Sequence, residues 1–399
     1  MMHRFLLSTL VVGFVTCAGI AEVKMPSFRP QEIDGRVEIG YGLAIADVDG
    51  DGRLDILLAD KRQIVWYSNP DWTRHLIAEN LTALDNVCVA ASDIDGDGKA
   101  EVAVGAGWNP NDTVKSGAVF YLQPPVNRRE RWTPIELPKE PTVHRMRWMK
   151  STSGASQLVV LPLHGRGNQG GNGEGVRMLA YSVPKDVRQP WPTEVVNASL
   201  HMTHNFELVD WNSKRGDELL VAGKEGVFLL DLHNGSWIRK ALGGNSQGQV
   251  DFIGAGEVRS GVVMNGRRFL ATVEPMHGNQ ACIYLEPPSN NTTSLWERVV
   301  IDKDLVDGHA VACGDLAAQG QSQVVVGWRG RKQGDSIGLK LYWSEDASGR
   351  AWKSVAIDSG KMACEDVALA DLNGDGKLDI IASGRSTKNV MIYWNEGAR

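Results

Sequence analysis

The sequence predicts an all-β fold, a seven-bladed β-propeller in which each blade has four strands. Three observations predict it: a unit of about 46 to 60 residues recurs seven times, short runs rich in Val, Ile and Leu alternate with turn residues, and helical periodicity is almost absent. Parallel β-helices need shorter repeats, and a β-sandwich would not produce seven equivalent units. The 399 residues are many for one ordinary core but suit a repeat architecture.

Each unit contains an inner strand, an acidic loop or its remnant, a second strand, and a third strand that often ends in Tyr or Trp. A fourth strand follows, marked by an aromatic residue and, four or five residues later, an aliphatic one. We expect these aromatic side chains to pack between blades. Six copies of the mark begin at Trp72, Trp132, Trp191, Trp237, Trp296 and Trp352.

The seventh copy of this mark, FRPQEI from Phe28, lies near the N-terminus, whereas the last unit stops after its third strand, MIYWN. A strand from the N-terminus can therefore complete the last blade. Closing the ring in this way removes free sheet edges, which otherwise favour aggregation. The sequence thus predicts a ring closed by an N-terminal strand.

Three acidic loops are intact: DVDGDGRLD from Asp47, DIDGDGKAE from Asp93 and DLNGDGKLD from Asp371. They place side-chain oxygens at loop positions 1, 3, 5 and 9, the alternation that Ca²⁺ needs for its about six to eight oxygen ligands. An EF-hand is excluded because position 12 is not Glu and a strand, not a helix, follows. The candidate ligands of up to three structural Ca²⁺ ions are Asp47, Asp49, Asp51 and Asp55; Asp93, Asp95, Asp97 and Glu101; and Asp371, Asn373, Asp375 and Asp379.

These DxDGDGxxD loops between strands resemble the FG-GAP or VCBS repeats of exported proteins, a family whose propellers bind Ca²⁺ in such loops. The motif is intact in three of the seven units. In the other four it has decayed, as in the loops that start at Asp210 and Asp315, and we expect no calcium there. The expected role of the ions is to stiffen turns.

Counting six residues back from loop position 1, or its equivalent, finds the residue that opens each inner strand near the central axis. Five consecutive blades present a histidine or a carboxylate at this level. The placement of Glu257 depends on aligning a unit that has no acidic loop. The series is Tyr41, Val87, His144, His204, Glu257, His309 and Glu365, with Asn86, Asp251 and Asp366 beside it.

The second strand of each blade returns to the same face, so its far end should border the same funnel. A single buried histidine is usually a satisfied core residue, but five at matched positions favour a functional site. The returning ends carry Lys61, Trp108, His164, Lys224, His277, Trp328, Arg329, Arg331 and Arg385.

Neutral imidazoles with a carboxylate suit Zn²⁺ or another divalent transition metal such as Mn²⁺ or Fe²⁺. Such a metal would polarise a carbonyl or hydroxyl, and a nearby His or Tyr could remove a proton α to the carbonyl. Basic rim residues would attract an anionic or polyhydroxylated substrate, and Trp108 and Trp328 could stack on sugar rings. The catalytic candidates are His144, His204, His309, His277, His164 and Tyr41; the funnel metal candidates are Glu257 and Glu365 with His144, His204 and His309.

The funnel, together with VHRMRW from Val143 and VEPMHGN from Val273, resembles the propeller part of the aldos-2-ulose dehydratase group. That group eliminates water from keto-sugars such as anhydrofructose, with a zinc ion in the propeller funnel. The resemblance implies a metal-dependent carbon–oxygen lyase in which funnel histidines bind metal or transfer protons. The cupin domains that follow the propeller in that group have no counterpart in this sequence, so isomerase chemistry is not expected.

Two other functions remain open on the sequence. A non-catalytic propeller that binds carbohydrate or protein would explain the loops and the fold, but not the histidine ring. A polysaccharide lyase would use similar His, Tyr and Arg chemistry, but a long polymer needs an open groove rather than a funnel. No G-x-S-x-G elbow and no phosphate-binding glycine loop occur, which argues against serine hydrolase and nucleotide chemistry.

The N-terminus resembles a secretory signal over residues 1–21, with Arg4, an apolar run over residues 5–15 and a small-residue exit at Ala21. The run is shorter than the roughly 20 apolar residues that span a bilayer. We therefore expect residues 22–399 to form one exported, periplasmic or extracellular domain without membrane insertion. The net charge of −6 gives no sign of nucleic-acid binding. Buried free thiols are the expected state of the remaining cysteines, Cys88, Cys282, Cys313 and Cys364.

Overall fold

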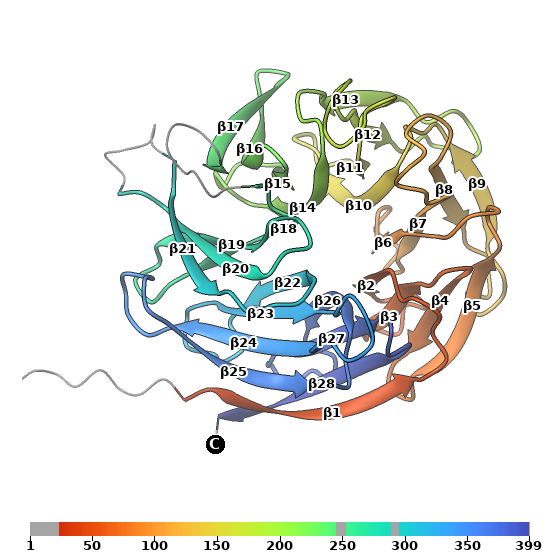
Figure 1. The fold of residues 1–399 in the computed structure, drawn as a ribbon. Helices are drawn as coiled ribbons and strands as arrows, with labels where there is room; N and C mark the ends of the chain where they lie inside the picture. Colours follow the sequence, from red (N-terminus) through yellow and green to blue (C-terminus); the bar gives the residue numbers. More distant parts are fainter. Residues whose placement is uncertain (1–23, 245–252, 289–294, 399) are drawn as a thin grey trace, which may run out of the picture.

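The computed structural model describes residues 24–244, 253–288 and 295–398. These residues form 28 strands in seven four-stranded antiparallel sheets arranged around one axis (Figure 1). The described part of the chain contains no helix, and so none that could cross a membrane. The predicted all-β propeller with seven four-stranded blades is confirmed. The predicted signal, residues 1–21, and Asp251 lie outside the described residues.

Each of the first six blades is built from four consecutive strands, named here from the axis outward. Blade one has β2 (Gly42–Ala46), β3 (Asp55–Ala59), β4 (Gln63–Ser68) and β5 (Thr73–Glu79). Blade two has β6 (Cys88–Ser92), β7 (Glu101–Ala106), β8 (Ala118–Gln123) and β9 (Thr133–Leu137). Blade three has β10 (Val143–Lys150), β11 (Ser156–Pro162), β12 (Met178–Ser182) and β13 (Thr193–Asn197).

The next three blades repeat this order. Blade four has β14 (Thr203–Val209), β15 (Glu218–Gly223), β16 (Gly226–His233) and β17 (Ser236–Gly244). Blade five has β18 (Glu257–Val262), β19 (Arg268–Glu274), β20 (Gln280–Leu285) and β21 (Glu297–Asp302). Blade six has β22 (Gly308–Gly314), β23 (Gln323–Trp328), β24 (Gly338–Ser344) and β25 (Trp352–Ser359).

Blade seven joins the two ends of the chain. It has β26 (Cys364–Ala370), β27 (Asp379–Gly384) and β28 (Val390–Ala398), and its outermost strand is β1 (Pro26–Asp34). β1 runs antiparallel to β28, as the red and blue ribbons in Figure 1 show, with Arg29 opposite Trp394. The predicted closure of the ring by an N-terminal strand is confirmed.

Packing between blades forms seven hydrophobic clusters, and each cluster joins two successive blades, including blade seven to blade one. The aromatic residues that mark the fourth strands each lie in a different one of these clusters, as expected. Leu57 in the first cluster is fully buried, and burying a leucine side chain stabilises the fold by about 1.5–3 kcal/mol. The four predicted free cysteines are unpaired; Cys88, Cys282 and Cys364 are buried and Cys313 is half-buried.

A polar contact crosses the seam between β1 and blade one. The carboxylate of Asp34, at the end of β1, accepts a hydrogen bond of 2.9 Å from the hydroxyl of Tyr67. It also lies 3.2 Å from the guanidinium of Arg74. The Tyr67 ring is fully buried, and burial and the Asp34 charge raise the pKa of its hydroxyl, so it stays a donor. This contact fixes the closing strand to the first blade.

We expect Asp34→Ala to lower the free energy of unfolding by about 2–3 kcal/mol, because a buried hydroxyl loses its acceptor and a guanidinium loses its partner. Urea unfolding measures this. Asp186→Ala is the matched control, since Asp186 also pairs with an arginine, Arg188, but is exposed, and its removal should change stability by at most about 0.5 kcal/mol. Equal urea midpoints for the two variants would contradict a structural role for the contact of Asp34 with Tyr67 and Arg74.

Candidate functional site

The three acidic loops connect β2 to β3, β6 to β7 and β26 to β27. In the first loop, the two carboxylate oxygens of Asp47 accept hydrogen bonds from the backbone amides of Gly50 at 2.7 Å and Gly52 at 2.8 Å. Both glycines have positive φ angles, 81° and 84°, which residues with a Cβ rarely adopt. The glycines thus allow the tight turn that the motif predicts.

Carboxylates gather inside two of these loops. Oxygens of Asp47, Asp49 and Asp55 lie within 4.8 Å of one another, as do those of Asp93, Asp95 and Glu101. Oδ1 of Asp49 is buried without a hydrogen-bond partner. Burial, and the charges of Asp49 and Asp47, raise the pKa of Asp55 to about 7 although backbone amides oppose the shift. Such crowding of carboxylates around one buried acidic group in each loop, Asp55 or Glu101, suits a bound cation.

The remaining predicted loop ligands are placed differently. The position-5 carboxylates turn toward basic side chains: Asp51 pairs with Arg53, Asp97 lies 3.9 Å from Arg128, and Asp375 lies 2.8 Å from Lys377. In the third loop, Asn373 occupies position 3, and Asp379 is a buried carboxyl whose pKa is raised by its burial. Asp371 accepts the amides of the two loop glycines in the same way as Asp47.

The predicted funnel residues lie at the opposite ends of the inner strands. His144, His204, His309 and Glu365 are each the second residue of their inner strand, and Glu257 is the first residue of β18. Tyr41 and Val87 directly precede β2 and β6. The structure therefore brings all seven positions to one end of the central channel.

Three histidines form a compact group, which we call the histidine triad: His204, His277 and His309. Their ring nitrogens lie within 4.8 Å of one another, and Nε2 of His204 is 2.6 Å from Nε2 of His277. His277 follows β19, on the returning side of blade five, whereas the other two lie on inner strands. The triad thus combines residues from three adjacent blades.

Hydrogen bonds set the tautomers of His204 and His309. Nδ1 of His204 lies 2.6 Å from the carbonyl oxygen of Gly256, and Nδ1 of His309 lies 2.5 Å from that of Glu365. A carbonyl oxygen only accepts, so each Nδ1 must carry the proton. In the neutral rings each Nε2 then carries a lone pair, as in histidines that bind metals. That of His204 faces Nε2 of His277.

His277 has the opposite tautomer. Its Nδ1 lies 2.9 Å from Nη2 of Arg329, and a guanidinium only donates. Nδ1 is therefore the acceptor, and the neutral ring carries its proton on Nε2, the atom that faces His204. Burial first, and then His204 and Arg329, lower the pKa of His277, so the ring stays neutral.

Arg329 is held by two carboxylates. Its guanidinium lies 2.6 Å from Asp307 and 2.7 Å from Glu365. The other oxygen of Glu365 lies 3.0 Å from Arg385 and 4.0 Å from Nε2 of His309. Glu365 therefore borders the triad while its charge is balanced by two arginines.

Glu257 lies behind the triad rather than inside it. Its Oε1 is 3.3 Å from Nδ1 of His204, the ring nitrogen on the side away from His277. Its Oε2 accepts a hydrogen bond of 2.7 Å from Asn205. Burial raises the pKa of Glu257, but His204 and Arg259 outweigh it, and the net shift is downward. An ionised Glu257 thus supports His204 from behind.

The other catalytic candidates surround the triad without joining it. The His144 ring is 4.6 Å from that of His204, but Arg145 donates to its Nδ1 at 3.0 Å, so its Nε2 carries a proton. His164 pairs with Met202 in an isolated β-bridge, and its buried Nδ1 has no partner. Burial and Asp85 raise the pKa of Tyr41, whose hydroxyl donates to Asp85 at 2.9 Å. The phenol therefore stays protonated.

The residues predicted to line the rim of the funnel lie in different environments. Trp108 packs edge-on against His144 at 4.8 Å between ring centroids. Trp328 is only 7% exposed and packs between blades five and six, so it offers no free face for stacking on a sugar. Nζ of Lys224 donates to the carbonyl of Gly170, and Lys61 lies 3.9 Å from Glu38. Arg331 lines a pocket beside His277.

Sequence reasoning missed Asp307 and Asp85. Asp307 lies two residues before His309, and Asp85 lies two residues before Val87. The backbone carbonyl of Asp307 accepts a hydrogen bond from the amide of Arg329, and that of Asp85 accepts one from the amide of Trp108. Extending the count from six to eight residues before the loop would have found both. Arg145 and Asn205, which directly follow funnel histidines, were also missed.

Family comparisons match both resemblances. A model described as aldos-2-ulose dehydratase, beta-propeller domain, matches residues 116–287. An FG-GAP-like repeat matches residues 47–104, and an FG-GAP repeat matches residues 89–122. Aldos-2-ulose dehydratase of Phanerodontia chrysosporium is 24% identical over 369 residues, which cover 86% of this chain and 40% of the relative. The chain thus spans less than half the length of this curated relative.

Solved structures share the fold at low identity. A chain of the mitotic checkpoint complex has a TM-score of 0.56 at 13% identity, with 98% of each chain covered. Hydrazine synthase of Kuenenia stuttgartiensis has 0.54 at 11%, covering 97% of this chain and 100% of that chain. The exotype rhamnogalacturonan lyase YesX has 0.52 at 14%, covering 94% and 76%. The chain therefore has a widespread propeller fold, carries FG-GAP repeats, and resembles the aldos-2-ulose dehydratase propeller domain, as its sequence predicts.

Proposed function

We propose that this protein is a metal-dependent carbon–oxygen lyase that removes water from a keto-sugar at the histidine triad. The carbon next to the carbonyl would lose a proton and the following carbon a hydroxyl group, so that a C=C bond forms between them. The observation that carries the proposal is the pair of opposite tautomers within the triad: two histidines present lone pairs and the third presents an N–H. The curated relative, named as a dehydratase of an aldos-2-ulose, supports a sugar as the substrate class.

The residues around the triad fit a divalent transition metal. His204 and His309 offer Nε2, and Glu365 is the carboxylate beside His309, a donor set of two imidazoles and one carboxylate that suits Zn²⁺ or Fe²⁺. Bound there, the metal would act as a Lewis acid on the substrate carbonyl. Two ligands of a tetrahedral zinc lie about 3.3 Å apart when Zn–N is about 2.0–2.1 Å. The 2.6 Å between His204 and His277 is shorter, which favours His277 as a neighbour rather than a ligand.

His277 supplies a hydrogen-bond donor to the substrate. In this structure its Nε2–H faces Nε2 of His204. If a metal took the lone pair of His204, this N–H could donate instead to a carbonyl or to the departing hydroxyl, and a neutral imidazole is able to polarise a carbonyl in this way. Arg329 holds the ring by Nδ1 and keeps the proton on Nε2. Asp307 and Glu365 in turn orient Arg329.

A pocket of about 690 Å³ borders His277. Met276 and Val306 form part of its apolar wall, and Asn279 and Arg331 supply polar groups. A polyhydroxylated substrate in this pocket would lie beside His277. The basic groups Arg329, Arg331 and Arg385 line a neighbouring pocket of about 630 Å³, which suits a ligand with several oxygens.

Replacing His309 and His277 should separate metal binding from proton donation. We expect His309→Ala to lose both the transition metal and activity, because a ligand is removed. His277→Ala should keep the metal, while kcat for water elimination falls by about 10²–10⁴-fold. Metal analysis of purified protein and the ultraviolet absorbance of the unsaturated ketone product measure the two effects.

His75→Ala is the control, since His75 lies on β5, outside the funnel, and should change neither quantity. Wild-type protein that contains calcium alone, and that shows no elimination of water from keto-sugars, would contradict the lyase proposal. That result would favour a non-catalytic carbohydrate- or protein-binding propeller.

The proposal also includes structural calcium in the acidic loops and export of the protein. The buried Oδ1 of Asp49, which has no hydrogen-bond partner, and the clustered carboxylates support calcium binding. The N-terminal pattern over residues 1–21 supports export. The loops lie at the other end of the inner strands from the triad, so the ions would act as scaffold.

Calcium at about 100 times its Kd should add about 2.7 kcal/mol per loop to the free energy of unfolding if only the folded state binds it. Calorimetry in Ca²⁺ and in chelator measures this as a shift in Tm. Asp49→Asn should reduce the shift, whereas Asp210→Asn, in a decayed loop, should leave it unchanged. A Tm that is the same in Ca²⁺ and in chelator would refute calcium binding.

A further inference from the structure

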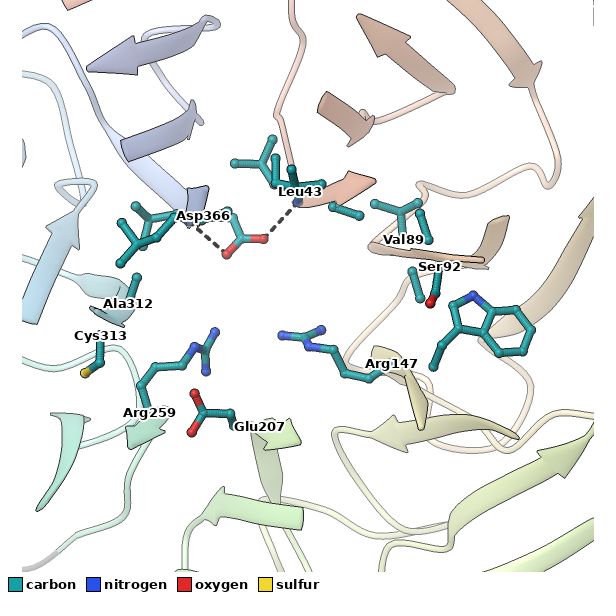
Figure 2. A pocket seen from close by; sticks show the side chains of 17 residues that line it. Leu43, Val89, Ser92, Arg147, Glu207, Arg259, Ala312, Cys313 and Asp366 are labelled. Carbon is teal, nitrogen blue, oxygen red and sulfur yellow. Dashed lines mark hydrogen bonds between the residues drawn. The ribbon is translucent and has the colours of Figure 1, made fainter. Parts of the chain in front are cut away.

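The central channel contains a chamber of about 400 Å³ between the triad and the acidic loops (Figure 2). Inner strands from all seven blades line it, and it reaches Ser92, the last residue of β6. One side of the chamber carries the apolar side chains of Leu43 and Val89 and, next to Leu43, the carboxylate of Asp366. The opposite side, from blades three to five, carries Arg147, Glu207 and Arg259. None of these groups has a part in the proposed lyase chemistry.

Two guanidinium groups face each other across this chamber, as Figure 2 shows for Arg147 and Arg259. The hydrogen bond of Arg147 goes from Nη1 to the carbonyl oxygen of Met146 at 2.9 Å, and its guanidinium lies 5.5 Å from the Phe206 ring centroid. Among the described residues, no carboxylate lies within 4.0 Å of its nitrogens. Arg259 donates to the carbonyl of Val258 at 2.6 Å and lies 3.5 Å from Glu257. Most N–H groups of Arg147 therefore lack a protein acceptor.

The two carboxylates of the chamber are bound to backbone amides instead. Asp366 accepts the amide of Leu43 with one oxygen and that of Val367 with the other, both at 2.9 Å. Glu207 accepts the amide of Ser260 at 2.7 Å. Neither carboxylate forms a direct ion pair with Arg147 or Arg259 within the described residues. Among the described residues, the guanidinium of Arg147 thus remains largely unpaired, and that of Arg259 has Nη1 engaged but Nε and Nη2 unpaired.

Like charges in a desolvated space repel each other. Burial, followed by the charge of Arg259, lowers the pKa of Arg147 to about 10. Burial also opposes the charge of Arg259, but the nearby carboxylates of Glu257, Glu207 and Asp366 outweigh it, and the pKa of Arg259 is raised instead. An anion between the guanidinium groups would offset the charge of Arg147 and accept the free N–H groups of both. A planar arginine fork matches the two oxygens of a carboxylate or phosphate.

We propose that the chamber binds a small oxyanion, with Arg147 and Arg259 as a two-sided clamp. The apolar side chains of Leu43 and Val89 suit the body of an organic carboxylate, whereas inorganic phosphate would use the clamp alone. The site is separate from the triad and does not depend on the proposed lyase activity.

Isothermal titration calorimetry on the full-length protein tests this clamp, with sodium acetate, sodium pyruvate and sodium phosphate as probes at constant ionic strength in chloride. We expect one anion per chain, with pyruvate tighter than acetate because of its larger body if an organic carboxylate is the ligand. Tighter phosphate binding would assign the clamp to an inorganic oxyanion. Arg147→Met and Arg259→Met should each weaken binding at least 10-fold.

Arg188→Met is the matched control, since Arg188 lies on the surface and pairs with Asp186, and it should bind as the wild type does. His204→Ala should also retain anion binding, even if it abolishes lyase activity. If wild-type protein binds none of the three probes, Glu207 and Asp366 balance the arginines by themselves and the proposal fails. Unchanged anion affinity in folded Arg147→Met and Arg259→Met would likewise overturn the proposal. If both variants fail to fold, the titration of the wild-type protein alone decides whether the chamber binds an anion.

Discussion

Closure of the ring is the constraint on which the rest of the structure depends. When β1 pairs with β28, blade seven packs on blade one, and all seven inner strands must share one axis. Residues distant in sequence, such as His204 and His309, then meet at one end of the channel, while the acidic loops lie at the other. A site assembled from several blades exists only while the ring is closed. The hydrophobic clusters between blades, rather than any single sheet, keep it closed.

Within the funnel, ion pairs and hydrogen bonds fix the tautomers of the histidine rings, which hydrophobic packing could not do. Asp307 and Glu365 hold Arg329, and Arg329 holds His277. Backbone carbonyls hold the other two histidines in the opposite tautomer. Three chemically identical side chains thereby differ in protonation, with the proton on Nδ1 in two rings and on Nε2 in the third. Burial keeps His277 and His309 neutral by lowering their pKa values.

The repeat pattern predicted the fold and the level of the funnel residues, because the position of a residue in a blade fixes its height along the axis. Even Glu257, whose unit lacks an acidic loop, opens its inner strand as predicted. Side-chain direction was not predictable in this way. Glu257 turns behind His204, and Trp328 packs between blades, because contacts between blades decide these rotamers and a single repeat does not encode them. The basic chamber was also missed, because the units of Arg147 and Arg259 have no acidic loop and the prediction followed only the residues at the start of each inner strand.

The protonation of the triad tests the account most directly. Imidazole ¹⁵N NMR of metal-free, histidine-labelled protein at neutral pH reports which nitrogen of each ring carries a proton. The account predicts a proton on Nε2 of His277 and on Nδ1 of both His204 and His309. A proton on Nδ1 of His277, or a cationic His277 ring, would contradict the hydrogen bond from Arg329 and the division of roles that depends on it.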